Sequence, residues 1–142
     1  MRIIKYGYSG KDELYRGAKV LTKVTFASFN DRLEIIKEAG NDVGKIKDWF
    51  DKLSIKYDDI RISGNNVIYC TDGNELLLAD LSSGERYMLY LLACKESNKK
   101  IVAESLFERL GSVLREAAEK NLRDYENLVV VLYNTWAPVG LK

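Results

Sequence analysis

Histidine is absent from this sequence, and cysteine and proline are scarce. The lack of histidine excludes a histidine general base, a histidine-activated nucleophile and histidine metal ligands within the chain itself. Cys70 and Cys94 lie far apart and form no CxxC pair, so neither a zinc knuckle nor a disulfide framework is encoded. We therefore expect two free thiols in a reducing compartment.

Long hydrophobic runs are also missing. No apolar stretch approaches the ~20 residues of a membrane span, and charges interrupt the N-terminal segment too early for a signal peptide. We expect a cytoplasmic protein without membrane contact. Glutamine is absent while lysine, glutamate, tyrosine and isoleucine are plentiful, a bias that fits a thermophile.

An excess of either charge is lacking too, because 22 basic residues oppose 21 acidic ones. Nucleic-acid binding is possible with this balance, but the charge does not support it. The nine tyrosines are spread along the chain and indicate no stacking platform for single strands. The 142 residues suit a single domain, with 1–55 as an N-terminal part and 56–142 as the remainder.

Hydrophobic periodicity and turn residues predict the elements of the fold. The first half should contain strands at 1–8 and 19–29, a helix from 30 or 31 to 39, an amphipathic helix at about 42–53 with Trp49 and Phe50 in its apolar stripe, and an antiparallel meander over 60–79. The second half should contain helices at 84–97 and 106–121 alternating with strands at 100–103 and 128–133. The fold class is therefore mixed α/β: an antiparallel meander beside a small parallel sheet core flanked by helices.

The most specific string is Leu81-Ser82-Ser83-Gly84-Glu85-Arg86, directly before a predicted buried helix. It resembles the signature motif of ABC-type ATPase heads, and its double serine is most similar to the RecF, SMC and OLD-like branch. The order of elements over 57–138 fits the same family. The resemblance implies that Ser82, Ser83, Gly84, Glu85 and Arg86 meet the phosphate of a nucleotide held by an opposite subunit, and hence that a protein partner exists.

Helix capping is the plainer interpretation of the same residues. Ser82 and Glu85 have the spacing of a capping box, in which each side chain accepts a hydrogen bond from the other residue's backbone N–H. Capping and phosphate contact use the same helix end and can coexist.

Departures from the family pattern are as informative as the match. Ala103 stands where the resemblance would place a Mg²⁺-organising aspartate, whereas Glu104 aligns with the catalytic base. Ser105 and Glu108 also have the spacing of a capping box for the next helix. The alternative interpretation of Glu104 is therefore a solvated residue at the end of the strand. Asn134 occupies the place of the switch histidine.

The phosphate loop pattern GxxxxGK[ST] is missing as well. Residues 7–12 lack its spacing and its final hydroxyl. If 19–26 were the preceding strand, residues 27–32 would stand in the loop's place, with Asp31 near the position of the lysine, and 1–55 would be a remnant of the phosphate-loop lobe. Alternatively, the chain is only the second lobe of such a head, and its N-terminal part is unrelated.

These observations predict a degenerate ABC-type ATPase-like protein that does not hydrolyse nucleotide by itself. It would act through a homodimer or as an accessory to a complete ATPase, possible roles being DNA maintenance or defence. No cofactor is expected, and ATP with Mg²⁺ would bind only with a partner subunit. Two alternatives stay open: an interaction or nucleic-acid accessory module without nucleotide chemistry, and a nucleotidase completed by a partner with Glu104 as the base.

Overall fold

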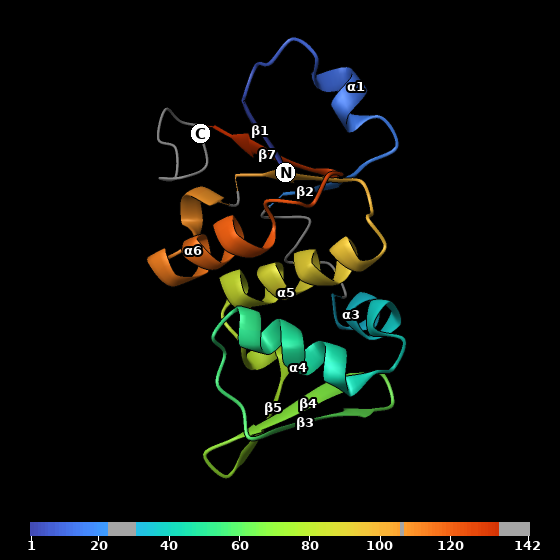
Figure 1. Ribbon diagram of the computed structural model, residues 1–142, viewed down its shortest axis with the longest axis vertical. Helices are drawn as coiled ribbons and strands as arrows, with labels where there is room; N and C mark the ends of the chain where they lie inside the picture. The colour runs from blue at the N-terminus through green and yellow to red at the C-terminus, as the bar shows by residue number, and fades with distance from the viewer. Residues whose placement is uncertain (23–30, 106, 134–142) are drawn as a thin grey trace. The chain divides into compact units, whose positions relative to one another are not determined.

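The computed structural model describes residues 1–22, 31–105 and 107–133, and the chain divides into two compact units (Figure 1). The first unit comprises residues 1–29 and 98–142, and the second comprises residues 30–97. One contains a parallel sheet and the other an antiparallel sheet, each with helices. The predicted mixed α/β fold class is therefore confirmed.

The first unit is built on a four-stranded parallel sheet of order β1-β7-β6-β2. Its elements are β1 (Arg2–Lys5), α1 (Lys11–Tyr15), β2 (Lys19–Leu21), β6 (Ile101–Glu104), the 3₁₀ turn η2 (Phe107–Arg109), α6 (Ser112–Asn121) and β7 (Leu128–Leu132). Every residue of β7 is buried, as expected for a parallel strand covered on both faces. Figure 1 shows α1 on one side of this sheet and α6 on the other.

Apolar side chains on one face of the parallel sheet form the core beneath α1. Ile4, Val102, Val129 and Val131 are its buried members, and Leu14, Tyr15, Ala18 and Val20 pack against them. Lys100 adds a polar restraint, because its ammonium donates to the carbonyl oxygens of Glu13, at 3.2 Å, and Arg16. A cation at the last carbonyls of a helix is a favourable cap. Lys100 therefore helps to fix the end of α1.

The second unit has an antiparallel sheet of order β3-β4-β5. Its elements are α3 (Asp31–Ala39), α4 (Val43–Lys52), β3 (Asp59–Ser63), β4 (Asn66–Thr71), β5 (Asn74–Leu77), the 3₁₀ turn η1 (Leu78–Asp80) and α5 (Ser83–Glu96). The β4–β5 turn places Asp72 and Gly73 at φ values of 51° and 80°. Two consecutive positive φ angles define the turn type that matches the twist of a tight hairpin.

Helix α4 packs against β3, and its apolar stripe forms the centre of the second unit. Trp49 and Phe50 are almost completely buried, as their spacing predicts. The Phe50 ring meets the rings of Tyr57 and Tyr69 edge to face, at centroid distances of 5.7 and 5.5 Å. This geometry is favourable for aromatic pairs.

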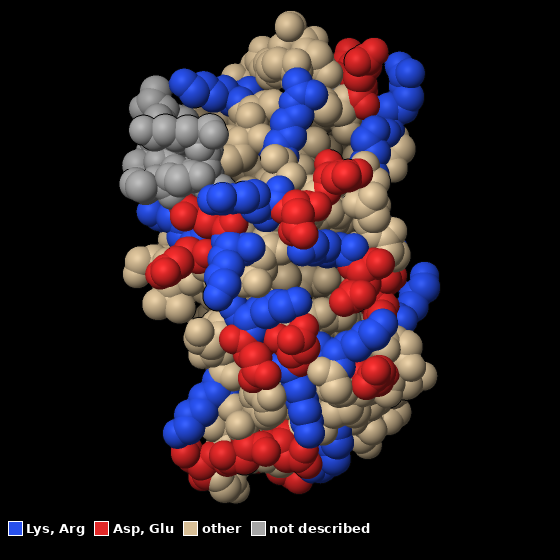
Figure 2. Space-filling view, in the orientation of Figure 1, with Lys and Arg blue, Asp and Glu red and all other residues tan. Residues whose placement is uncertain are grey.

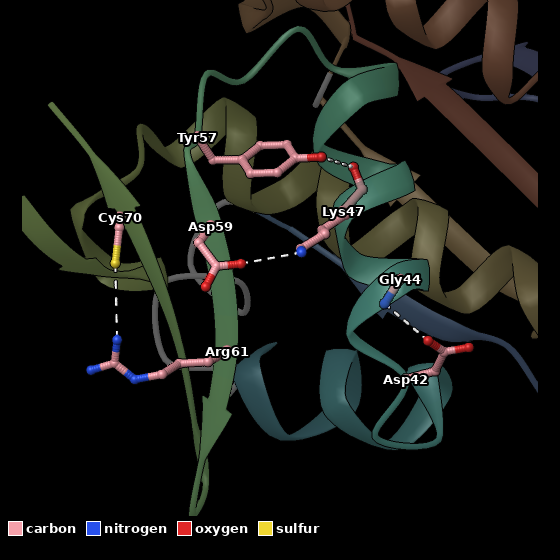
Figure 3. A network of polar contacts seen from close by, with 7 residues as sticks. All are labelled: Asp42, Gly44, Lys47, Tyr57, Asp59, Arg61 and Cys70. Atoms are coloured by element: carbon pink, nitrogen blue, oxygen red, sulfur yellow. Dashed lines mark hydrogen bonds and ion pairs between the residues drawn. The ribbon is translucent and has the colours of Figure 1, made fainter.

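Polar contacts at the surface join the same helix to the sheet (Figure 3). The Asp42 carboxylate caps α4 by accepting from the Gly44 N–H at 2.9 Å. Lys47 pairs with Asp59 of β3 at 3.1 Å, which lowers the pKa of the Asp59 carboxyl through the hydrogen bond from the ammonium. Both side chains are exposed, so this pair adds little stability.

Some sequence predictions require correction. The predicted continuous helix at 106–121 is wrong, because η2 ends at Arg109 and α6 begins only at Ser112 after the N-cap Gly111. Val113, an apolar residue of α6, is 61% exposed. In the described part of the predicted strand at 19–29, β2 covers only Lys19–Leu21, and residues 23–29 lie outside the described range.

Neither cysteine forms a disulfide, as predicted; Cys94 is buried and Cys70 is half-buried. Within the described ranges, no helix has the length and apolarity needed to cross a membrane. The suggested boundary between 1–55 and 56–142 falls between α4 and β3, inside the second unit.

Candidate functional site

The segment Leu81–Arg86 forms the start of α5. Ser82 is the N-cap: its Oγ accepts from the Glu85 N–H at 3.2 Å, and Glu85 Oε1 accepts from the Ser82 N–H at 3.0 Å. Both halves of the predicted capping box are therefore present. Ser82 and Ser83 are exposed, Gly84, Glu85 and Arg86 are half-buried, and every residue from Tyr87 to Cys94 is buried.

This capping box determines what the helix end offers to an anion. The backbone N–H groups of Ser83 and Gly84 belong to the first turn and have no partner within the helix. The hydroxyls of both serines retain O–H groups that can donate. The Glu85 carboxylate, however, already complements the positive end of the helix dipole and repels a phosphate. The arrangement can contact an anion presented by another molecule, but it is a weak anion site by itself.

Glu104, the second candidate, is the last residue of β6 and lies in the first unit. Two tyrosine hydroxyls donate to its carboxylate: Tyr15 from the end of α1 to Oε1 at 2.7 Å, and Tyr133 from the end of β7 to Oε2. The side chain is half-buried. The carboxylate thus joins three elements of the fold, and the interpretation of Glu104 as a merely solvated strand end is wrong.

The same contacts change the acidity of the tyrosines. Burial and the hydrogen bond to Glu104 raise the pKa of Tyr15 far above its ordinary value. The hydrogen bond to Glu104, followed by burial, raises the pKa of Tyr133 to about 12. Both phenols therefore stay neutral donors at neutral pH, and neither is suited to act as a proton acceptor.

The residues around Glu104 supply little of a phosphoryl-transfer site. Ala103 is completely buried and apolar, so it cannot organise a metal ion. The predicted capping box between Ser105 and Glu108 is replaced by another contact: Glu108 Oε1 accepts from the Tyr133 N–H at 2.6 Å. In the described ranges, no group of three or more Asp, Glu or Cys side chains is placed to hold a metal ion.

Two further site predictions fall outside the described residues. These are Asn134, proposed for the switch position, and residues 27–30 of the segment suggested in place of the phosphate loop. A strand–loop–helix connection occurs instead at residues 6–10, which join β1 to α1. That is the backbone context of a phosphate loop, but the sequence has the wrong spacing and α1 has only five residues.

Sequence reasoning missed a cluster of tyrosines at the carboxyl ends of the parallel strands. Tyr6 follows β1, Tyr133 follows β7, and their rings stack with centroids 4.5 Å apart. Tyr15 reaches the same carboxylate as Tyr133. The signal available in the sequence was an aromatic residue directly after each of two apolar strands, since parallel strands end at one edge of the sheet.

One face of the molecule shows how its charged side chains are distributed. Figure 2 shows basic and acidic side chains interspersed on the visible face. Among the described residues of this face, the distribution agrees with the near-zero net charge and shows no electrostatic footprint for nucleic acid.

Comparison with known proteins adds no relative to this picture. No protein-family model matches the chain, and no curated protein matches it significantly.

Proposed function

We propose that this chain is a degenerate ABC-type ATPase-like protein that does not hydrolyse nucleotide alone and acts through a protein partner. The partner is a second copy or a complete ATPase subunit, to which the chain presents Ser82–Arg86. The observation that carries the proposal is the position of this motif. The motif starts the largely buried helix α5. In the order of the sequence, this helix follows strands β3, β4 and β5 and precedes the parallel strands β6 and β7.

The local chemistry supports a role without turnover. Phosphoryl transfer depends on a positioned lysine, a metal ion and a base. The chain has no GxxxxGK[ST] loop, has buried Ala103 before the candidate base, and engages both oxygens of Glu104 with tyrosine hydroxyls. Because each oxygen already accepts a hydroxyl donor, the carboxylate has fewer lone pairs left to accept a hydrogen bond from an attacking water.

Magnitudes support the dependence on a partner. Micromolar binding of ATP needs about −8 kcal/mol. The start of α5 offers roughly 0.3–1 kcal/mol from the dipole and about 1.5–3 kcal/mol for each charged hydrogen bond, against an association cost of at least ~4 kcal/mol. The repulsion from Glu85 reduces the gain further. The chain alone is therefore expected to bind nucleotide weakly or not at all.

Calorimetric titration with Mg-ATP, combined with sedimentation before and after, tests this proposal. We expect no binding tighter than about 100 μM and no turnover by the chain alone. Tight binding with ATP hydrolysis that disappears in Glu104→Gln but persists in Glu108→Gln would contradict the proposal and favour a nucleotidase.

The partner surface has its own test in self-association. Ser83→Trp places a bulky ring on the exposed first residue of α5, and Ser112→Trp does the same at the exposed first residue of α6. If the partner is a second copy, the unmodified chain sediments as a dimer, Ser83→Trp reduces the dimer and Ser112→Trp does not. For a complete ATPase as partner, the same pair of variants is compared in stimulation of that ATPase.

The complete capping box favours a second candidate, an interaction module in which Leu81–Arg86 only starts a helix. In that case Ser82→Ala lowers stability, while Ser83→Trp leaves every association unchanged.

A further inference from the structure

Three tyrosines of the first unit that follow strands β1 and β7 are exposed. Tyr6, Tyr8 and Tyr133, which we call the tyrosine surface, are 62%, 40% and 43% exposed. Tyr6 and Tyr133 follow β1 and β7, and Tyr8 lies in the loop after β1. Tyr6 and Tyr133 therefore stand near the carboxyl edge of the parallel sheet, the edge at which open α/β sheets bind their ligands, whereas the Tyr8 ring lies against Arg2 at the start of β1.

Part of this surface is held rigidly before anything binds. The Tyr6 N–H donates to the Leu132 carbonyl at 2.8 Å, which continues the pairing of β1 with β7. The Tyr133 ring stacks on Tyr6, its hydroxyl donates to Glu104 and its N–H donates to Glu108. A preorganised aromatic pair loses little conformational entropy on binding.

The charge beside this ring pair is negative. Glu104 and Glu108 approach Tyr133 from its hydroxyl and its backbone, and both carboxylates are half-buried. The raised pKa of Tyr133, to about 12, has its hydrogen bond to Glu104 and the charges of both glutamates among its causes. A place that disfavours an added negative charge favours a positive one.

The chain itself contains a guanidinium beside one of these tyrosine rings. The guanidinium of Arg2 lies 5.3 Å from the centroid of the Tyr8 ring, and its Nη2 donates to the Tyr8 hydroxyl at 2.7 Å. Guanidinium is planar and weakly hydrated, so it stacks on an aromatic face and pairs with a carboxylate at the same time.

We propose that the tyrosine surface, with Glu104 and Glu108 at its side, binds an arginine side chain of a protein partner. The guanidinium lies over the exposed ring of Tyr6 and faces the carboxylate of Glu108. This inference uses residues of the first unit only, and its test needs neither nucleotide nor the residues Ser82–Arg86.

Other occupants fit this surface less well. A lysine ammonium is compact and strongly hydrated and cannot stack. A nucleobase can stack on Tyr6, but its phosphates would meet the two glutamates. Stacking and charge complementarity agree only for the planar cation.

The test uses three pentapeptides, Gly-Ser-X-Ser-Gly, in which X is arginine, lysine or citrulline. Each is titrated into the isotope-labelled full chain, and the backbone N–H signals of Tyr6, Tyr8 and Tyr133 are followed by NMR. We expect the arginine peptide to bind with a Kd of about 1–10 mM, the lysine peptide several-fold more weakly, and the neutral citrulline peptide not measurably.

Paired variants assign the binding to particular groups. Tyr6→Phe should retain the affinity because the ring remains, whereas Tyr6→Leu and Glu108→Gln should each weaken it about two- to fivefold. Val113→Ser, at an exposed apolar residue of α6, is the control and should change nothing.

Equal binding of the three peptides, or no binding of the arginine peptide, would overturn the proposal. The proposal would also be overturned if Tyr6→Phe bound the arginine peptide as weakly as a correctly folded Tyr6→Leu variant, since the hydroxyl rather than the ring would then determine the affinity. An oligothymidylate that shifts the same signals at lower concentration than the arginine peptide would replace the cation site by a nucleobase site.

Discussion

Glu104 is the residue at which sequence and environment diverge most. Its place at the end of a buried strand suggests a base facing water, yet its two oxygens accept from Tyr15 and Tyr133. Those donors come from residues far from Glu104 in the sequence, so the residues next to Glu104 do not predict them. The chemical character of this carboxylate is therefore set by tertiary contacts.

Tyr133→Phe should remove part of the alkaline sensitivity of the fold. The pKa of Tyr133 is raised to about 12 in the folded chain, while an unfolded tyrosine has a pKa of about 10. The neutral Tyr133 phenol therefore contributes fully to the free energy of unfolding below pH ~10, and this contribution is lost as the pH rises from there towards ~12. Urea unfolding at pH ~8 and pH ~11 should show a smaller loss of stability in the variant than in the unmodified chain.

Tyr8→Phe is the matched control, because the Tyr8 hydroxyl contacts Arg2. An alkaline loss that is equal in Tyr133→Phe and the unmodified chain would show that the bond to Glu104 does not persist in solution.

Ser82→Ala should destabilise the chain by about 1 kcal/mol, within a range of roughly 0.5–2. The variant loses the Oγ acceptor of the Glu85 N–H and breaks the reciprocal box at the start of α5. Urea denaturation at neutral pH measures the change. Ser83→Ala removes an equally exposed hydroxyl from the next residue, so a loss of similar size there would contradict the capping role of Ser82.

At the scale of elements, local signals located most helices and strands, and tertiary contacts decided the exceptions. The apolar stripe of α4, the turns of the β3-β4-β5 meander and the start of α5 are encoded within a few neighbouring residues. The break between η2 and α6 was missed because the apolar period continues through Leu110, which is buried although it is not helical. The tyrosine cluster was missed because its members are separated by most of the chain.

Gly111→Ser should stabilise α6. Gly111 is the N-cap, with φ −67° and ψ 169°, and no side chain caps the helix. A Cβ at this position meets nothing within 4 Å. Serine supplies an acceptor for the first turn and restricts the unfolded chain, which together add about 0.5–1 kcal/mol to the free energy of unfolding.

Gly73→Ser is the control with the opposite expected sign. A Cβ there also has open space, but the backbone lies at φ +80° in the tight β4–β5 turn. A residue with a side chain is strained in that conformation and should destabilise the hairpin by about 1 kcal/mol. A loss of stability in Gly111→Ser as large as that in Gly73→Ser would refute the capping argument for α6.

At the scale of the whole molecule, the first unit is built from two separate segments of the chain. The chain leaves this unit after residue 29 and returns to it at residue 98. The neighbouring parallel strands β2 and β6 are thus joined through the entire second unit. Parallel neighbours always require a crossover, but its length is not restricted to one helix. Counting elements along the sequence therefore identified the strands without revealing that β1 and β2 complete the sheet of β6 and β7.

The chain should bind single-stranded DNA no more tightly than about 0.1 mM at physiological salt. Affinity for nucleic acid without sequence preference comes from cations that release counterions, and it falls steeply as salt rises. Here the net charge is +1 and both signs are interspersed on the visible face (Figure 2). The stacked pair Tyr6–Tyr133 adds a ring face but has two glutamates beside it. Fluorescence anisotropy with a labelled oligothymidylate at two salt concentrations measures this. Micromolar binding with a steep salt slope would show that basic residues act together in solution. It would support the accessory nucleic-acid role, which the near-neutral composition does not support.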